Sequence, residues 1–243
     1  MRILSAQKSG GSEAEQMALG ALPQWNLADL YPAIDAPELL ADMERARADA
    51  VAFETRWKGK LEEAAQKGRD GQFGVALQDY EKLEELLGRI VSYAGLVYAG
   101  DTSDPKRTKL YGDVQEKMTD VSAHLLFFPL ELNLIDDSLI ERALDEDPLF
   151  GHYRPWVIYL RKDKPYQLED RVEQLFHEKS VTGRGAWNRL FDETMTELRF
   201  DVGGEELLLE QTLNRLQDAN GDTRREASEA LARTFGKNLK TFT

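Results

Sequence analysis

The amino-acid sequence predicts an all-α protein, mainly helical with long antiparallel helices, and one small β-hairpin near residues 198–209. Apolar residues recur at steps of three and four through most of the chain, which places them on one face of an α-helix. Glycine, proline and aspartate separate these stretches, so several helices are expected. A period of two is found on either side of Gly203-Gly204 and predicts the hairpin.

The composition fits a soluble protein with a hydrophobic core. Of the 243 residues, 42% are hydrophobic and 31% are charged, and the formal net charge is −13. Because an acidic protein is repelled by nucleic acids and by anionic membrane surfaces, we expect neither as a partner. The chain has no cysteine, which excludes disulfides, cysteine-ligated zinc and thiol catalysis. The longest apolar run, residues 125–130, is too short to cross a bilayer, so a cytoplasmic location is expected.

Three parts are expected along the chain. Residues 1–24 are rich in glycine, serine and alanine and are predicted to be mobile. Residues 25–145 are predicted to form a long-helix hairpin region. Residues 146–243 are predicted to hold shorter helices and the β-hairpin.

The first long helix is predicted to begin near Asp35. This aspartate is a candidate N-cap, Pro37 suits the first turn, and Glu38 stands three residues on, as in a capping box. A polar, glycine-rich turn is expected at residues 68–74. The apolar stripe between these signals consists of Leu39, Met43, Ala46, Ala50, Phe53, Trp57 and Leu61.

Two further long helices follow, separated by a turn at residues 100–105. Ser103 or Asp104 is expected to cap the third helix, with Pro105 in its first turn. Pro129 lies inside the third stripe and predicts a kink near residues 125–129. The second stripe is Tyr80, Leu83, Leu87, Ile90, Ala94 and Val97, and the third is Leu110, Val114, Met118, Val121, Leu125, Phe128 and Leu132.

The helices become shorter after residue 136. They are expected at about 137–144, 150–162, 168–180 and 183–197, and, after the hairpin, near 210–217. A last helix follows a turn at residues 220–222. Its apolar face is Ala227, Leu231, Phe235, Leu239 and Phe242. No stop signal precedes Thr243, so the helix is expected to continue in a longer chain.

His177-Glu178 reproduces the first half of the H-E-x-x-H zinc protease signature. Such a site needs two histidines at i and i+4, so that both bind one ion while the glutamate activates a water. The second position here is Val181, which cannot bind zinc. Glu173 is also four residues from His177, but two ligands do not make a stable site. The pattern therefore favours a polar residue near a helix end.

The other two histidines are also expected to be structural. His124 stands four residues after Asp120 and is interpreted as a hydrogen-bonded residue at the edge of the core. His152 lies between aromatic residues and is expected to pack or cap locally. Residues 183–185, Gly-Arg-Gly, lack the strand and later glycine of a nucleotide-binding turn, and Thr182 is expected to cap the following helix.

The remaining candidates give no catalytic or metal site. No serine stands in a G-x-S-x-G setting. The paired acids Glu62-Glu63, Asp136-Asp137 and Glu205-Glu206 are expected on exposed faces, and Trp57, Tyr93 and Tyr98 in the core. The sequence assigns no catalytic residue and no metal ligand, and leaves the substrate-binding residues unknown.

Several stretches, in their order and spacing, resemble the oligoendopeptidase F family of thimet-oligopeptidase-like zinc metallopeptidases. The resemblance runs from about residue 25 to the end. It is carried by W-N-L-A-D-L-Y at residues 25–31, Y-A-G-D-T-S-D-P at 98–105, H-Y-R-P-W at 152–156, E-K-S-V-T-G at 178–183, Trp187, L-F-D-E at 190–193 and L-R-F-D-V at 198–202.

The resemblance implies a helical clamshell that cleaves short peptides inside a deep channel. The family's H-E-x-x-H helix and its third zinc ligand, a glutamate, lie downstream of the matched region, so none of them has a counterpart here. It thus implies an N-terminal lobe that leads into a catalytic domain absent from this chain. Zinc is expected in the parent protein and not in this segment, and short peptides and the C-terminal catalytic domain are the expected partners.

Two interpretations remain open. In the first, the chain is the N-terminal lobe of a metallo-oligoendopeptidase, which walls the channel and is inactive alone. In the second, it is a standalone, non-enzymatic helical module that binds peptides or a partner, with a homodimer through an exposed apolar face as one form. A truncated lobe should expose an apolar strip along residues 227–242, whereas a standalone protein should bury it.

Overall fold

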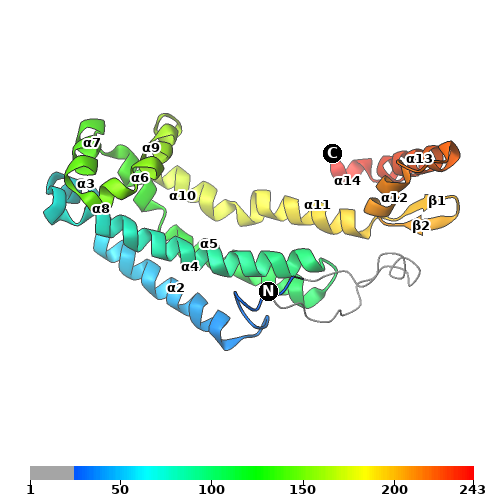
Figure 1. Cartoon of the computed structure of the whole chain (residues 1–243), viewed down its shortest axis with the longest axis horizontal. Helices are drawn as coiled ribbons and strands as arrows, with labels where there is room; N and C mark the ends of the chain where they lie inside the picture. The colour runs from blue at the N-terminus through cyan, green and yellow to red at the C-terminus, as the bar shows by residue number, and fades with distance from the viewer. Residues whose placement is uncertain (1–24) are drawn as a thin grey trace. The chain divides into compact units, whose positions relative to one another are not determined.

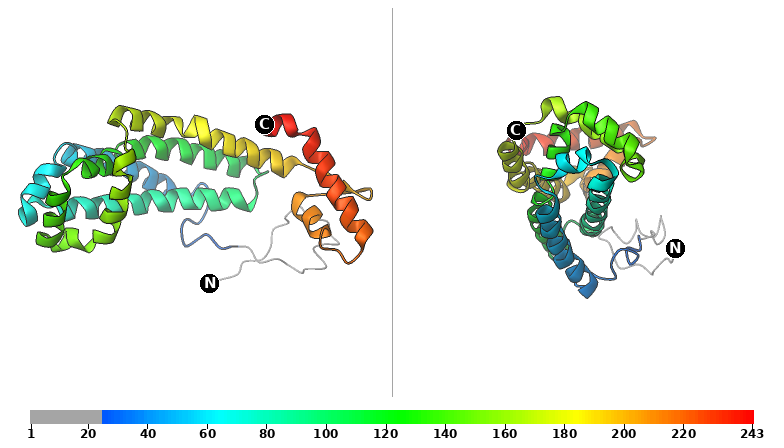
Figure 2. Two further views of the ribbon diagram at one scale, coloured as in Figure 1. Left: turned by 90° about the horizontal axis from the view of Figure 1, so that it is seen from above. Right: turned by 90° about the vertical axis from the view of Figure 1, so that its left-hand side faces the viewer.

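The computed structural model describes residues 25–243, and the segment predicted to be mobile, residues 1–24, lies outside this range. The described chain is mainly helical with one two-stranded sheet, which confirms the predicted fold class (Figures 1 and 2). It divides into two compact units: unit 1 ends at Val181 and unit 2 begins at Thr182. The division predicted at residues 145/146 therefore falls inside unit 1. None of the helices within residues 25–243 combines the length and apolar character needed to span a membrane.

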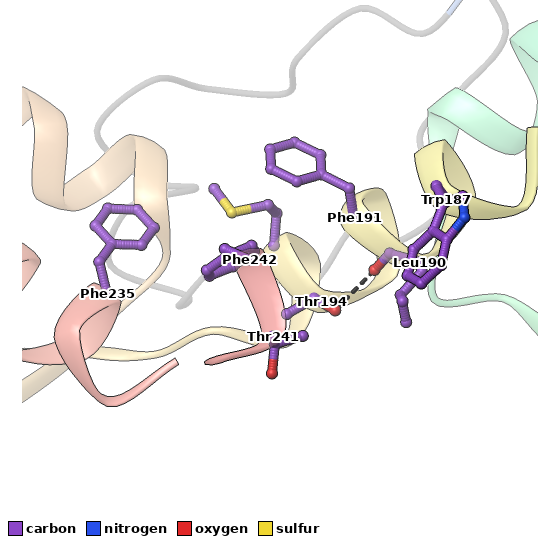
Figure 3. Close-up of a pocket in the computed structure, with 8 residues that line it drawn as sticks. Trp187, Leu190, Phe191, Thr194, Phe235, Thr241 and Phe242 are labelled. Atoms are coloured by element: carbon purple, nitrogen blue, oxygen red, sulfur yellow. Dashed lines mark hydrogen bonds between the residues drawn. The ribbon is translucent and has the colours of Figure 1, made fainter. Parts of the chain in front are cut away.

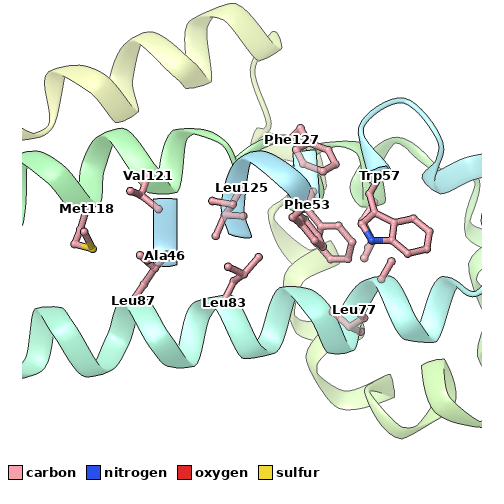
Figure 4. Packing of buried hydrophobic residues seen from close by; sticks show 14 of the residues in the cluster. Ala46, Phe53, Trp57, Leu77, Leu83, Leu87, Met118, Val121, Leu125 and Phe127 are labelled. Carbon is pink, nitrogen blue, oxygen red and sulfur yellow. The ribbon is translucent and has the colours of Figure 1, made fainter. Parts of the chain in front are cut away.

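Three long helices build unit 1: α2 (Pro37–Trp57), α4 (Phe73–Gly100) and α5 (Pro105–Ala123). They lie side by side, as Figure 1 shows, and α4 contacts both of the others. The predicted stripes face one another across this core. Figure 4 shows Ala46 and Phe53 of α2, Leu83 and Leu87 of α4 and Val121 of α5, which all belong to one buried hydrophobic cluster. The helical periodicity thus predicted which residues are buried.

The start and end of α2 differ from the prediction. Ala36, not Asp35, occupies the N-cap position, because Pro37 is already the first helical residue. The helix stops at Trp57 and does not continue to Leu61, which begins the short helix α3 (Leu61–Gln66). The chain turns at Gly59, whose φ of 75° suits glycine. Leu61 is nevertheless buried in the same core, so the apolar period continues across the turn.

The turn between α4 and α5 follows the predicted pattern. Of the two candidate caps, Asp104 is the N-cap: its carboxylate accepts the backbone N–H of Lys106 at 2.8 Å and of Arg107 at 3.4 Å. Ser103 instead donates its hydroxyl to Asp101. The kink predicted near Pro129 is a complete break, since α5 ends at Ala123 and α6 (Phe127–Leu134) begins anew. Pro129 then lies in a first helical turn, where its missing N–H costs no hydrogen bond.

The rest of unit 1 is a series of short helices. Where one helix was predicted over 150–162, the chain forms two and a 3₁₀ turn. These elements are η1 (Gly68–Gly71), α7 (Asp137–Glu146), α8 (Pro148–His152), α9 (Arg154–Leu160), η2 (Arg161–Tyr166) and α10 (Asp170–Lys179).

The buried carboxylate of Asp147 caps two helices at once. It accepts the N–H of Leu149 at 2.9 Å and of Phe150 at 3.3 Å, at the start of α8. It also accepts the N–H of Gly74 at 3.0 Å, in the first turn of α4. Beside it the rings of Phe73 and Phe150 stack with their centroids 4.2 Å apart. One side chain therefore fixes the end of the α4 helix against α8.

Unit 2 is small and is built around the hairpin. Strands β1 (Phe200–Val202) and β2 (Glu205–Leu207) pair antiparallel, with Phe200 opposite Leu207. Gly203 and Gly204 form the turn with φ of 63° and 88°, which confirms the predicted hairpin and its turn. The other elements are η3 (Val181–Gly185), α11 (Ala186–Glu197), α12 (Leu209–Arg215), α13 (Gly221–Lys237) and α14 (Leu239–Phe242).

Two predicted features of unit 2 are wrong in detail. The helix expected over 183–197 starts at Ala186, and Gly185 rather than Thr182 occupies its N-cap position. The last helix is interrupted at Asn238, where the backbone leaves the helical conformation. Its buried residues Ala227 and Ala230 pack with Leu198, Phe200, Val202 and Leu207 in one small core.

Candidate functional site

His177 links α10 to α5 by hydrogen bonds. Its Nε2 lies 3.1 Å from the backbone oxygen of Thr119 and 3.0 Å from the hydroxyl oxygen of Ser122. Because a carbonyl oxygen can only accept, Nε2 must carry the proton and donate it. This nitrogen is therefore not available to bind a metal ion or to take a proton from Ser122.

The neighbours of His177 are also engaged in local structure. Glu173 accepts the backbone N–H of Leu168 at 2.9 Å, and Glu178 accepts from the side chain of Gln174 at 2.9 Å. Across residues 25–243, no three or more His, Asp or Glu side chains are grouped so as to hold a metal ion. The residues around the H-E pair do not fit a zinc site.

His124 is bonded across the core edge to α2 rather than to Asp120. Its Nδ1 lies 2.6 Å from Glu54, which also binds Lys58 at 2.6 Å. Burial alone would raise the pKa of Glu54, but the hydrogen bonds from Lys58 and His124 outweigh it and hold that pKa below its usual range. The prediction of a hydrogen-bonded histidine at the edge of the core is confirmed.

The remaining candidates also have the structural roles predicted for them. His152 packs its ring edge-on against Tyr153, with centroids 5.2 Å apart. The hydroxyl of Tyr153 donates to Glu81 at 2.5 Å, and this bond, with some burial, raises the pKa of Tyr153 to about 12. The paired acids Glu62-Glu63, Asp136-Asp137 and Glu205-Glu206 are exposed, whereas Trp57, Tyr93 and Tyr98 are buried.

A pocket of about 460 Å³ opens in unit 2 between α11 and the α13–α14 end (Figure 3). None of its lining residues is charged: they are Trp187, Leu190, Phe191, Thr194, Met195, Phe235, Thr241 and Phe242. The rings of Phe191 and Phe242 meet edge to face at 5.9 Å. Such a pocket can bind an apolar group, and none of its lining side chains ionises to act as an acid or base.

The apolar face of α11 was not found from the sequence. Trp187, Leu190, Phe191 and Thr194 stand at helical spacing, and 69% of Trp187 and 52% of Phe191 are exposed. Along residues 227–242, an exposed apolar strip was expected of a truncated lobe and a buried one of a standalone protein. Most of that strip packs against the hairpin, and Leu239 alone among its apolar residues is largely exposed, at 60%. The apolar stripe of α11 is present in the sequence, but the spacing of apolar residues does not show which helix face lacks a packing partner.

The chain resembles known peptidases in sequence over one region and in fold over most of its length. The family model described as Oligopeptidase F matches residues 131–200. Oligoendopeptidase-F from Enterococcus faecium superposes with a TM-score of 0.69 and 18% identity, over 84% of this chain and 40% of that chain. A putative peptidase from Chlamydophila abortus gives a TM-score of 0.48 and 16% identity, over 90% of this chain and 36% of that chain.

No curated protein matches the sequence significantly. The chain spans less than half the length of each of the two solved structures. The resemblance to oligoendopeptidase F is confirmed by the family match at residues 131–200 and by the shared fold.

Proposed function

We propose that this chain is the N-terminal helical lobe of a zinc metallo-oligoendopeptidase and forms a wall of its peptide channel. The match of residues 131–200 to the oligopeptidase F family carries the proposal. The shared fold supports it over a larger part of the chain. The long helices of unit 1 suit a wall, because their buried stripes make a stiff layer that does not depend on a ligand.

In this proposal the hydrolytic chemistry is supplied by residues outside the chain. The H-E pair of α10 does not serve it, because His177 donates to Thr119 and Val181 takes the place of a second ligand. Zinc would be bound by a catalytic domain with its own H-E-x-x-H helix. The lobe would exclude folded proteins and position short peptides, in the cytoplasm.

The catalytic domain is the proposed partner of the apolar face of α11. This face is exposed and its pocket is uncharged, a combination that marks interfaces more often than free surface. Because Trp187, Leu190 and Phe191 are 69%, 41% and 52% exposed, complete burial against another domain would contribute roughly 1–2 kcal/mol for each side chain.

Two measurements on the 243-residue chain test the proposal. Incubated with zinc and internally quenched short peptides, the chain should show no turnover, and elemental analysis should find no stoichiometric zinc. One zinc per chain with turnover would refute the proposed division of labour. Tight binding of a peptide by the chain alone, with no longer gene product, would favour a standalone binding module instead.

The coding sequence beyond Thr243 gives the decisive comparison. If it encodes an H-E-x-x-H helix, the longer protein should cleave the same peptides and lose activity when its metal is chelated. His177→Gln should leave that activity within about twofold, because glutamine can still donate to Thr119 and the residue takes no part in the chemistry. Loss of activity in this variant would indicate instead that His177 of α10 takes part in the zinc site.

A further inference from the structure

The stretch that joins the two units has no core of its own. Between Val157 and Leu198, none of the side chains is buried, although most of the stretch is helical. Tertiary packing supplies most of the stability of helices in proteins. Residues 158–197 therefore depend on the few contacts that attach them to each unit.

Those contacts lie on either side of residues 178–185. On the unit 1 side, Arg161 donates to the backbone oxygens of Leu132 and Ile135, and Gln167 donates to that of Leu130. Further along, His177 of α10 is bonded to Thr119 and Ser122 of α5. On the unit 2 side, Phe191 of α11 packs against Phe242, and Met195 packs against the core of the hairpin. Residues 178–185 have no buried side chain, and no side-chain hydrogen bond joins them to another element of the described chain.

The helical conformation is broken in the middle of this free stretch. Within η3, Gly183 has φ −95° and ψ −110°, outside the helical range. The boundary between the units, between Val181 and Thr182, lies next to it. The helix that follows, α11, starts at Ala186, and its N-cap residue Gly185 provides no side-chain cap. Two glycines in three residues disfavour a continuous helix by about 1 kcal/mol each relative to alanine.

We propose that residues 182–185 are a hinge about which unit 2 turns relative to unit 1. The α10 and α11 helices would move as rigid extensions of their units, and the change in backbone dihedrals would be absorbed at Gly183. Hinges of this type are short segments at the ends of helices, where few contacts have to be broken. The inference stands on the chain's own geometry and does not require the proposed peptidase function.

The absence of native cysteine allows a direct test with pairs of spin labels. One pair, Glu85→Cys with Ser228→Cys, joins exposed positions of α4 and α13 and reports on the distance between the units. A second pair, Glu85→Cys with Lys106→Cys, stays inside unit 1. Pulsed electron–electron double resonance should give a distribution of label-to-label distances at least about twofold broader for the first pair than for the second.

Gly183→Ala should narrow the first distribution, because alanine favours a helix that runs through the hinge. A side chain at residue 183 meets no atom within 4 Å, so the substitution causes no clash. Gly236→Ala is the matched control: it lies in α13, also has open space, and should change nothing. A between-unit distribution as narrow as that inside unit 1, or one that Gly183→Ala leaves unchanged, would overturn the hinge.

Discussion

Replacement of Asp147 should destabilise unit 1 far more than the loss of an ordinary helix cap. Its carboxylate holds three backbone N–H groups, two at the start of α8 and one, that of Gly74, in α4. Asp147→Ala removes a cap, which costs about 1 kcal/mol. It also leaves the buried N–H of Gly74 without an acceptor, which costs about 1–3 kcal/mol. We expect a total loss of about 2–4 kcal/mol.

Asp147→Asn separates the two contributions. Its amide can keep an oxygen toward Leu149 and Phe150, but its NH₂ group then faces the N–H of Gly74, and two donors cannot bond. The cap of α8 is retained and the loss should be about 1–3 kcal/mol. Asp136→Ala is the matched control, because Asp136 caps only α7 and is exposed, and should cost about 1 kcal/mol.

Urea unfolding in a Trp187→Phe background measures these differences. The remaining tryptophans, among them the buried Trp57 of α2, then report on unit 1 alone, and circular dichroism follows the helices. The expected order of destabilisation is Asp147→Ala, then Asp147→Asn, then Asp136→Ala. Equal losses of about 1 kcal/mol for all three would refute the reasoning, since the bond to Gly74 would then contribute nothing.

Four further outcomes are expected. Tyr31→Phe should lower the free energy of unfolding by about 1 kcal/mol at pH 7, through loss of the 2.8 Å bond to Asp42. Burial and this bond raise the pKa of Tyr31, so the difference in unfolding free energy between wild type and variant should shrink in urea titrations above pH 10. Glu131→Gln should stabilise the protein slightly at pH 7 in thermal melts, because burial raises the Glu131 pKa and charging it penalises the fold; the gain should vanish as pH falls below about 4. Phe200→Ala should cost about 3–5 kcal/mol and unfold unit 2 while unit 1 stays folded, as judged by near-native unit 1 resonances in NMR spectra. Limited trypsin digestion should cut the described chain first after Arg184, giving fragments that mass spectrometry identifies as ending at 184 and starting at 185, and Arg184→Gln should slow this cut.

The buried stripes of the long helices could be predicted because one rule governs them. Residues such as Phe53, Leu87 and Val121 recur every three or four positions, and any packed helix must bury that face. The Asp104 cap and the hairpin turn were predictable for a similar reason. Their signals, a capping residue before Pro105 and two adjacent glycines, act within a few residues.

The ends of helices were predicted less well, because the apolar period does not stop where a helix stops. Leu61 continues the α2 stripe although the chain has turned at Gly59, and Leu125 continues the α5 stripe across the break before α6. Both residues are buried in the same core, so the pattern records the common core and not the path of the backbone.

The roles of individual polar residues could not be predicted where their partners are distant in sequence. His177 resembles a zinc ligand until Thr119 is known to lie beside it, 58 residues away. The apolar face of α11 raises the opposite difficulty. Its stripe is regular, but no local signal shows that Trp187 and Phe191 remain more than half exposed in the described chain.

The double cap at Asp147 also bears on the order in which the protein is made. Gly74 precedes its acceptor Asp147 by 73 residues, and Gly59 precedes its acceptor, the carboxylate of Glu131, by 72. At translation rates of 5–20 residues per second, roughly 4–15 s separate the synthesis of Gly74 from that of Asp147. During this interval the N–H of Gly74 has no carboxylate of Asp147 to bond. The N-terminal half of unit 1 can therefore be helical early, but it is completed only when the following short helices emerge.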